Sequence, residues 1–186
     1  DARPPRSQPA RATPRIATSV YKDTFVSPSR QMAMARYDMV LLNMWLSLAD
    51  KDKIVSTIRR TNPDVILGQY SILSEARDDY PAITGPLSSN GWWLRNAAGE
   101  RVQWTGDYKA YEVNITRWAA PDHSGRRWPQ WLADHDSRTH FARLPLDFLM
   151  SDTVQMPDVS ADWKGAGSNQ GKSDPEVQRA VREGHA

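Results

Sequence analysis

Two short apolar runs constrain the fold of this 186-residue chain more than any other feature of its sequence. They are DMVLLNM at 38–44 and DVILGQY at 64–70, and runs without alternation are typical of strands covered on both faces. A helical pattern lies between them, with Asp50 as candidate N-cap and Asn62, which precedes a proline, as its end. Its apolar stripe consists of Ile54, Val55 and Ile58. A strand, a helix and a strand within about 30 residues predict a βαβ unit of a parallel sheet.

The second half of the chain repeats this alternation. YEVNI at 111–115 is a third strand candidate, 128–140 carries apolar residues at helical spacing, LDFLM at 146–150 is a fourth strand candidate, and Asp174 precedes a final helix. Repeated βα units predict a parallel α/β fold, either doubly wound or a barrel. No Gly-x-Gly-x-x-Gly or Walker sequence supports a nucleotide-binding doubly wound fold. Because a (β/α)8 TIM-type barrel takes about 250 residues, we expect the N-terminal half of one.

Two segments stand outside this pattern. Residues 1–15 hold four Pro and four Arg with almost no apolar side chains, so we expect a disordered basic tail before the half-barrel at 16–186. The formal net charge is only +2, so nucleic-acid binding would depend on this tail alone, and a solvated linker is the simpler interpretation. GWWLRNAAGERVQW at 91–104 indicates a Trp-rich hairpin insertion with its turn at 97–99.

The composition excludes several classes of protein. Without Cys, the chain has no disulfide framework, thiolate nucleophile or Cys-ligated zinc. No apolar run approaches the roughly 20 residues that cross a bilayer, since Asn43 interrupts the longest one, so no membrane-spanning helix is expected. The chain begins at Asp1 rather than Met, as a chain does after removal of a secretory signal, and we expect a secreted or periplasmic protein.

Polar and aromatic side chains follow the predicted strands, at the edge where parallel α/β folds place their active sites. The candidates are Asn43, Trp45, Tyr70, Ser71, Glu75, Asn114, Thr116, Trp118 and Asp152. This mixture suits a sugar ligand, because indole faces pack on pyranose C–H groups while carboxylates and amides bind hydroxyls. Cleavage of a glycosidic bond also needs two carboxylates. Asp152 is the best placed, since a carboxylate directly after an apolar strand has no packing role.

The same candidates also have purely structural interpretations. Asp152 can cap the loop after its strand through Asx hydrogen bonds, and Glu75 begins a charged stretch typical of a solvated helix face. Trp92 and Trp93 form either a sugar platform or, with Trp104, a hydrophobic cluster that closes their hairpin.

Two further patterns carry little functional information. His135 and His140 are five residues apart, a poor fit to one helix face, so no metal site is expected. The glycosylation sequon at 114–116 lies in a predicted buried strand, and this motif often matches by chance.

Six segments follow one another along the chain: RYDMVLLN, DVILGQYS after its Asn-Pro turn, WWLRNAAGERV, YEVNIT, LDFLMSDTV and SADWKGAG. Their order and spacing, from about Ile16 to the end, resemble glycosyl hydrolase-like family fifteen, a family of glycoside-hydrolase-type barrel proteins. The resemblance implies a (β/α)8 glycosidase architecture, whose acid/base carboxylate lies on a later strand than the four found here.

LDFLMSDTV is also similar to the fourth-strand motif of α-galactosidase-type barrels, in which an Asp-aromatic-Leu core leads to a second Asp at the strand end. By this resemblance Asp152 is the nucleophile, and Asp147 is a structural or substrate-contacting carboxylate. Phe148 stands where the family-fifteen pattern usually has Gly, so this segment is divided between two relatives.

These patterns together predict a glycoside hydrolase acting on a poly- or oligosaccharide, with no cofactor. Asp152 is expected to act as nucleophile or general base. The expected substrate-binding side chains are Trp45, Tyr70, Glu75, Trp92, Trp93, Asn114 and Asp147. Two alternatives stay open: a carbohydrate-binding half-barrel without hydrolytic activity, and an assembly module whose basic tail binds an acidic partner.

A half-barrel leaves an open edge at its fourth strand, and such an edge associates with other strands unless it is covered. We therefore expect the chain to form a homodimer or to pack against a missing second half, with Leu146, Phe148 and Met150 near the seam. Light scattering at micromolar concentration checks this expectation, and a stable monomer contradicts it.

Overall fold

The computed structural model falls into two compact units. The residues that it describes are 15–19, 27–43, 47–105, 109–152, 160–171 and 173–184. The first unit comprises Asp1–Tyr70 and His140–Met150, and the second comprises Ser71–Thr139 and Ser151–Ala186. Of the predicted basic tail, only Arg15 lies within the described residues.

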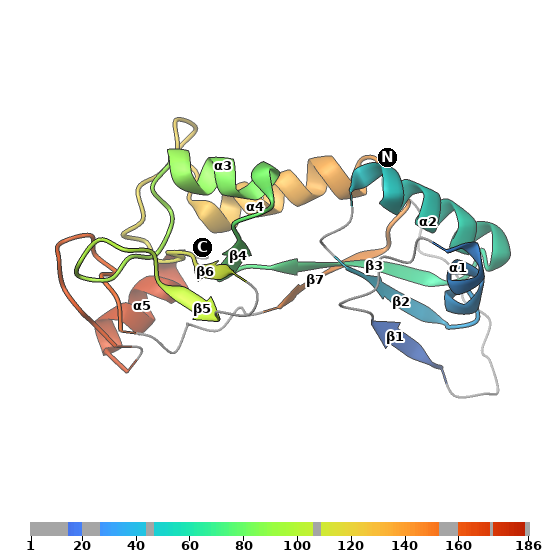
Figure 1. The fold of residues 1–186 in the computed structure, drawn as a ribbon, viewed down its shortest axis with the longest axis horizontal. Coiled ribbons are helices and arrows are strands. Elements are labelled where there is room, and N and C mark those ends of the chain that lie inside the picture. Colours follow the sequence, from blue (N-terminus) through green and yellow to red (C-terminus); the bar gives the residue numbers. More distant parts are fainter. Residues whose placement is uncertain are drawn as a thin grey trace. The chain divides into compact units, whose positions relative to one another are not determined.

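A four-stranded sheet runs in the order β1-β2-β3-β7 (Figure 1). Its strands are β1 (Ala17–Ser19), β2 (Met39–Leu42), β3 (Ile66–Ile72) and β7 (Phe148–Asp152). The first three pair in parallel. β7 follows β3 in the same direction, because the Asp147 N–H donates to the Leu67 carbonyl (2.7 Å) and, further along, the Leu73 N–H donates to the Asp152 carbonyl (3.3 Å). The prediction of a parallel α/β fold is therefore confirmed.

Neighbouring strands of this sheet follow one another in chain order. Doubly wound sheets reverse their strand order at a switch point, whereas strands of a (β/α)8 barrel succeed one another around the sheet. The observed order is shared by a barrel sector and by the strands on one side of a switch point, so a half-barrel stays a prediction.

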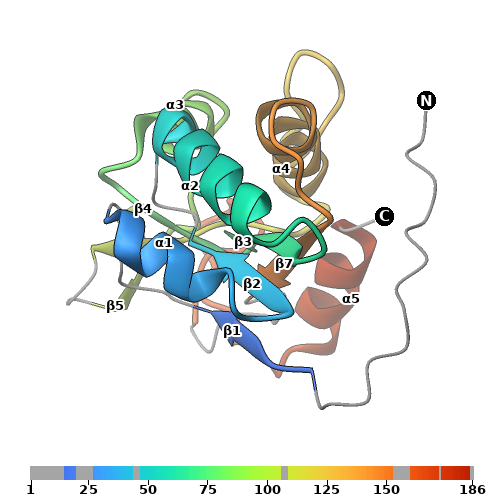
Figure 2. The same cartoon turned by 90° about the vertical axis from the view of Figure 1, so that its right-hand side faces the viewer.

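Helices α1 (Pro28–Met34) and α2 (Leu48–Thr61) pack against each other in the first unit (Figure 2). The predicted N-cap of α2 is wrong: Ser47 caps the helix, because its Oγ accepts from the N–H of Asp50 (3.1 Å), and Asp50 lies in the first turn. The helix ends before Asn62, as predicted. The apolar stripe of α2 packs in a core that includes Val40, Leu42, Ile54, Val55, Ile58, Val65 and Leu67.

A close contact between β3 and β7 explains two unusual residues. The ring of Phe148 lies over Gly68, so a Cβ at position 68 would collide with it. A large side chain on one strand is thus accommodated by the absence of a side chain on the next. Leu146 is also buried in the first unit, whereas Met150 is 37% exposed. Of the three predicted seam residues, Met150 is therefore the one at the surface.

The second unit contains a separate antiparallel sheet in the order β4-β6-β5. Its strands are β4 (Glu75–Arg77), β6 (Ala110–Glu112) and β5 (Gln103–Thr105). The prediction that 111–115 joins the parallel sheet is therefore wrong, and β1 is the additional parallel strand. The alternation of 111–115 explains the difference, since one face of an antiparallel strand packs on a core. The residues on that face are Tyr111, Val113 and Ile115.

The segment 91–104 turns back on itself. The Val102 N–H donates to the Leu94 carbonyl (3.0 Å), and the turn is held by Asn96, whose Oδ1 accepts from the N–H of Glu100 (2.9 Å). Gly99 in this turn has φ +81°, a conformation that favours glycine.

Three helices complete the second unit: α3 (Pro81–Ser89), α4 (Trp128–Asp136) and α5 (Pro175–Gly184). A π-helical turn, Ser137–Phe141, follows α4. α5 begins after Asp174, as predicted, and the Asp174 carboxylate accepts from the N–H of Glu176 (2.8 Å). Within the described parts of the chain, no helix has the length and apolar character needed to cross a membrane.

Asp147 joins three segments of the first unit just before β7. Its Oδ2 accepts from the Leu67 N–H of β3 (2.9 Å) and from the guanidinium of Arg59 on α2. Arg59 also donates to the Pro145 carbonyl (2.9 Å), and its side chain is only 12% exposed. These bonds position the amino end of β7, which accounts for an Asp at the start of an apolar strand.

Replacing Asp147 by Asn should lower the free energy of unfolding by about 1–3 kcal/mol, because the mostly buried Arg59 loses its anion. Urea denaturation measures this change. Asp52→Asn, on the exposed side of α2, is the matched control and should change stability by less than about 0.5 kcal/mol. Equal effects of the two substitutions contradict the role assigned to Asp147.

Candidate functional site

The carboxyl ends of β3 and β7 lead into the second unit and bring two predicted site residues together. β7 ends at Asp152, whose carbonyl accepts from the N–H of Leu73, the residue after β3. Glu75 begins β4 two residues later. The two side chains are close enough for the charge of Asp152 to act on the ionisation of Glu75. A pair of carboxyl groups therefore lies where parallel α/β folds place their active sites.

A third carboxyl group, that of Glu112, is one that no sequence motif singled out. It is the partner of Glu75 across the β4–β6 pair. The Glu112 N–H donates to Val102 (2.8 Å) and its carbonyl accepts from Leu94 (2.9 Å), so both of its backbone groups point away from β4. Glu75 and Glu112 thus form a non-hydrogen-bonded pair, in which Cα atoms lie about 4.5 Å apart and the side chains share one face.

Apolar side chains cover this face of the small sheet. Continuing the register of Trp93 with Val113 places Leu94 opposite Glu112. Leu94 packs with Ala161, Trp163 and Val177. Glu75 is 6% exposed and Glu112 is 1% exposed. Among the described residues, the Oε2 atom of each glutamate has no hydrogen-bond partner. These are costly positions for ionised carboxylates.

The electrostatic consequence is a pair of glutamates that retain protons unusually well. Burial raises the pKa of Glu75 to about 7, and the charge of Asp152 is the second cause. Burial also raises the pKa of Glu112 to about 8, with the charge of Glu75 as the second cause. At neutral pH the pair therefore holds at least one proton, beside the half-buried Asp152. Such an arrangement is suited to proton transfer.

Alternation along 111–115 was the signal that could have identified Glu112. Tyr111 and Val113 belong to the apolar cluster on one face of the sheet, so Glu112 lies on the opposite face, beside Leu94. A glutamate inside a strand flanked by apolar residues is uncommon without a function or a partner.

The other polar candidates lie elsewhere or have structural contacts. Asn114 Nδ2 donates to the Trp163 carbonyl (3.0 Å), and its Oδ1 accepts from the hydroxyl of Thr116 (2.6 Å). Asn114 therefore fastens the loop after β6. Tyr70, which is buried, and Asp147 belong to the first unit.

Trp92 and Trp93 lie in the core of the second unit, where they are 0% and 3% exposed. The indole N–H of Trp93 donates to the hydroxyl of Ser88 (2.9 Å), and that of Trp92 donates to a backbone carbonyl (2.7 Å). Packing accounts for both rings, and neither presents an open face. The hydrophobic-cluster interpretation is therefore confirmed for Trp92 and Trp93 and is wrong for Trp104. Trp104 is 51% exposed, and Trp45 lies outside the described residues.

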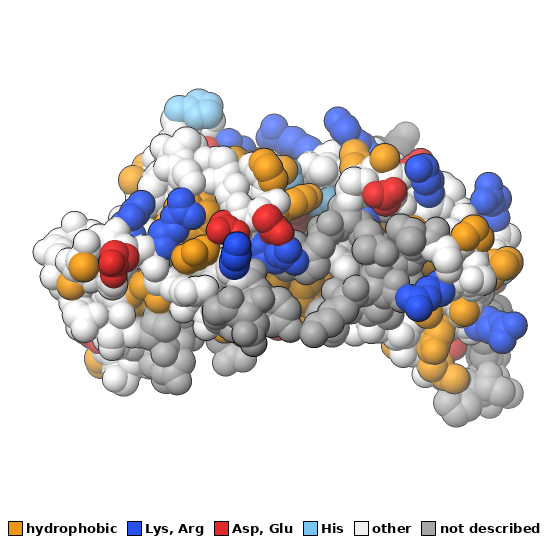
Figure 3. Space-filling view, viewed as in Figure 1, with side chains coloured by type: hydrophobic (Ala, Val, Ile, Leu, Met, Phe, Trp, Pro, Cys, Tyr) orange, Lys and Arg blue, Asp and Glu red, His pale blue; other side chains and the backbone are white. Residues whose placement is uncertain are grey.

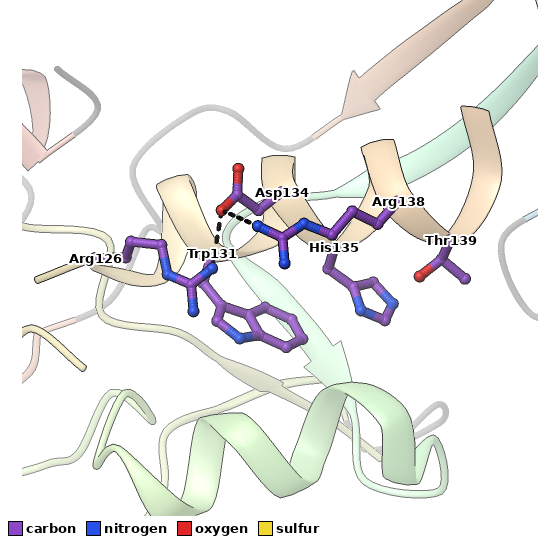
Figure 4. A pocket seen from close by; sticks show the side chains of 6 residues that line it. All are labelled: Arg126, Trp131, Asp134, His135, Arg138 and Thr139. Carbon is purple, nitrogen blue, oxygen red and sulfur yellow. Dashed lines mark hydrogen bonds and ion pairs between the residues drawn. The ribbon is translucent and has the colours of Figure 1, made fainter. Parts of the chain in front are cut away.

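A pocket along α4 is a second polar feature of this unit (Figure 4). It is lined by Arg126, Trp131, Asp134, His135, Arg138 and Thr139. The rings of Trp131 and His135 stack with centroids 4.9 Å apart. Asp134 pairs with Arg126 (2.8 Å) and with Arg138 (3.4 Å), so the two arginines of the pocket share one carboxylate. Nowhere in the described ranges do three His, Cys, Asp or Glu side chains gather as a metal site requires.

The distribution of surface charge bears on nucleic-acid binding. On the face shown in Figure 3, the described Lys and Arg side chains are interspersed with Asp and Glu. Nucleic-acid backbones are bound through concentrated positive charge, which this face does not display among its described residues.

Comparison with known proteins identified solved structures with a partial likeness to this chain but no family. No family model and no curated protein matches the chain. The glycoside hydrolase domain of PelA from Pseudomonas aeruginosa has 16% identity and a TM-score of 0.45, over 75% of this chain and 44% of that one. A xylosidase from Aspergillus niger has 12% identity and a TM-score of 0.45, over 90% of this chain and 28% of that one. The chain spans less than half of either structure.

Likenesses with TM-scores below 0.5 establish no activity for this chain. The resemblance to family fifteen and to the α-galactosidase-type motif stays a prediction.

Replacing Glu112 by Gln should change the free energy of unfolding differently at pH 8 and at pH 4. The change should be more favourable to the folded state at pH 8, by roughly 1–3 kcal/mol, since a pKa difference of one corresponds to about 1.36 kcal/mol. Both glutamates have folded-state pKa values above the ordinary 4.5, so between pH 4.5 and about 8 the folded protein binds more protons than the unfolded chain. Wild-type stability therefore falls as the pH rises through this range, and Gln removes the contribution of Glu112.

Urea denaturation at the two pH values measures the difference. Glu100→Gln, in the exposed turn of the hairpin, is the control and should have the same effect at both. A pH-independent effect of Glu112→Gln contradicts the raised pKa.

Proposed function

We propose that this chain is a carbohydrate-active protein of the glycoside hydrolase type that cleaves a poly- or oligosaccharide. The observation that carries the proposal is the placement of Asp152 and Glu75 after adjacent parallel strands, with Glu75 buried enough to keep a proton near neutral pH. Glycosidic cleavage needs such a combination, a protonated carboxyl group and an ionised one on either side of the bond.

Each carboxyl group has a role in this scheme. Glu75 transfers its proton to the glycosidic oxygen as the bond from that oxygen to the anomeric carbon breaks. Asp152 either attacks the anomeric carbon, forming a glycosyl ester that water then hydrolyses, or takes a proton from the attacking water. The low exposure of Glu75 supports the acid role, because an exposed carboxyl group is ionised at neutral pH.

A glycosidase site also needs more strands around it than the described parallel sheet supplies. Within the described residues, the edge strands β1 and β7 each pair with one strand of the parallel sheet. We infer that a second copy of the chain or further barrel strands complete the sheet beyond β7. A secreted or periplasmic location, where polysaccharides are accessible, belongs to the same proposal.

Asp152→Asn and Glu75→Gln should each lower hydrolysis by about 10²- to 10⁴-fold. The two variants are separable by the leaving group: p-nitrophenolate leaves with little help from an acid, so Glu75→Gln should retain more activity on p-nitrophenyl glycosides than on polysaccharides. Asp152→Asn should lose activity on both. Release of p-nitrophenol and of reducing ends measures this across a panel of sugars.

Glu100→Gln is the control and should hydrolyse like the wild type. Wild-type activity should also fall as the pH rises above about 7, when Glu75 loses its proton. Polysaccharide binding without hydrolysis by the wild-type protein would favour the carbohydrate-binding alternative and contradict the enzyme.

A further inference from the structure

We propose that Glu75 and Glu112 share a proton as a carboxyl pair, in which Glu112 is a positioning residue that stabilises Glu75 each time Glu75 gives its proton up. The pairing stands on the geometry of the small sheet. Only its catalytic consequence rests on the proposed function.

Backbone hydrogen bonds on both sides keep the two glutamates opposite each other. The Val113 N–H donates to the Ser74 carbonyl (2.7 Å), one residue from each glutamate, and fixes the β4–β6 register. On its other side β6 is held by the bond from Glu112 to Val102 (2.8 Å). The backbones of the two glutamates therefore cannot separate without breaking the sheet.

One proton satisfies both side chains at once. The Oε2 atoms of both glutamates lack a partner among the described residues, and both side chains are more than nine-tenths buried. Two ionised carboxylates here would repel each other and would lack donors. When one carboxyl is protonated, its O–H can donate to the oxygen of the other, which satisfies a donor and an acceptor together.

Among the described residues, the charges near this pair leave the proton as its source of compensation. From β7, Asp152 adds negative charge beside Glu75, and Glu75 in turn acts on Glu112. The neighbouring cations are engaged elsewhere. On β4, Arg77 pairs with Asp79, and in the segment packed near Leu94, Lys164 pairs with Glu176 (2.7 Å), while Asp162 accepts from the amides of its own loop.

The pair has a consequence for the proposed reaction. The form of the pair that acts as an acid carries two protons, one on each glutamate. After Glu75 has passed its own proton to the leaving oxygen, it is a buried carboxylate beside Glu112, which keeps its proton. The carboxyl O–H of Glu112 then donates to it, which stabilises the charge until a proton from water restores the starting state. Glu112 touches no substrate in this scheme and acts through Glu75.

Titration of the glutamate side-chain carboxyl ¹³C resonances by NMR tests the pair in the full chain. In the wild type we expect two midpoints above pH 6, separated by more than about one pH unit. In Glu75→Gln, Glu112 should titrate below the upper wild-type midpoint, because the charge that opposed its ionisation is gone. In Glu112→Gln the upper midpoint should disappear. Glu100→Gln, the exposed control, should leave both midpoints in place.

Two results would overturn the pair: wild-type midpoints near the ordinary glutamate value, or a midpoint that does not respond when the partner is replaced. A positioning role is tested by a second comparison, in which Glu112→Gln, which keeps a hydrogen-bond donor, should retain more hydrolysis than Glu112→Leu. Coupled titration in a protein that hydrolyses no sugar supports the pair and rejects the proposed function. Hydrolysis without coupled titration rejects the pair alone.

Discussion

β3 and β7 pair although the residues that join them, Leu67 and Asp147, are 80 positions apart in the chain. Three different contacts hold this pairing: the backbone ladder, the carboxylate of Asp147 with Arg59, and the ring of Phe148 over Gly68. Closing so long a loop costs entropy that a single contact would not recover. The site depends on the same pairing, because Asp152 ends one of these strands and Glu75 follows the other.

The small sheet of the second unit separates two environments. Ala76, Tyr111 and Val113 pack into the apolar cluster that contains Trp92 and Trp93, while Glu112 and Leu94 lie on the opposite face. Apolar packing on both faces removes water from Glu112, and the sheet register adds a second acid beside it. Folding gains nothing from two buried acids, since a pair of apolar side chains would fill the same space at lower cost. This imbalance is typical of a functional site.

Packing explains most of the aromatic content of this unit, which is one of the two interpretations that the sequence leaves open. Trp92, Trp128 and Trp163 are fully buried, and each indole N–H donates to a backbone carbonyl. Large rings fill the interior of a small unit with few side chains, and their N–H groups satisfy carbonyls that loops leave unpaired. The abundance of Trp in this unit is therefore explained by packing and is not by itself evidence of a ligand.

The sequence by itself determined the elements whose signals are local. β2, β3, the end of α2 before Asn62 and the start of α5 after Asp174 all follow from apolar runs and capping residues. Only the tertiary structure decided three other features: the register of Glu75 with Glu112, the place of 111–115 in an antiparallel sheet, and the burial of Trp92. The physical reason is that strand pairing and desolvation depend on residues distant in the chain. Glu112 is therefore an ordinary glutamate in the sequence, and its pKa is raised only by burial in the folded protein.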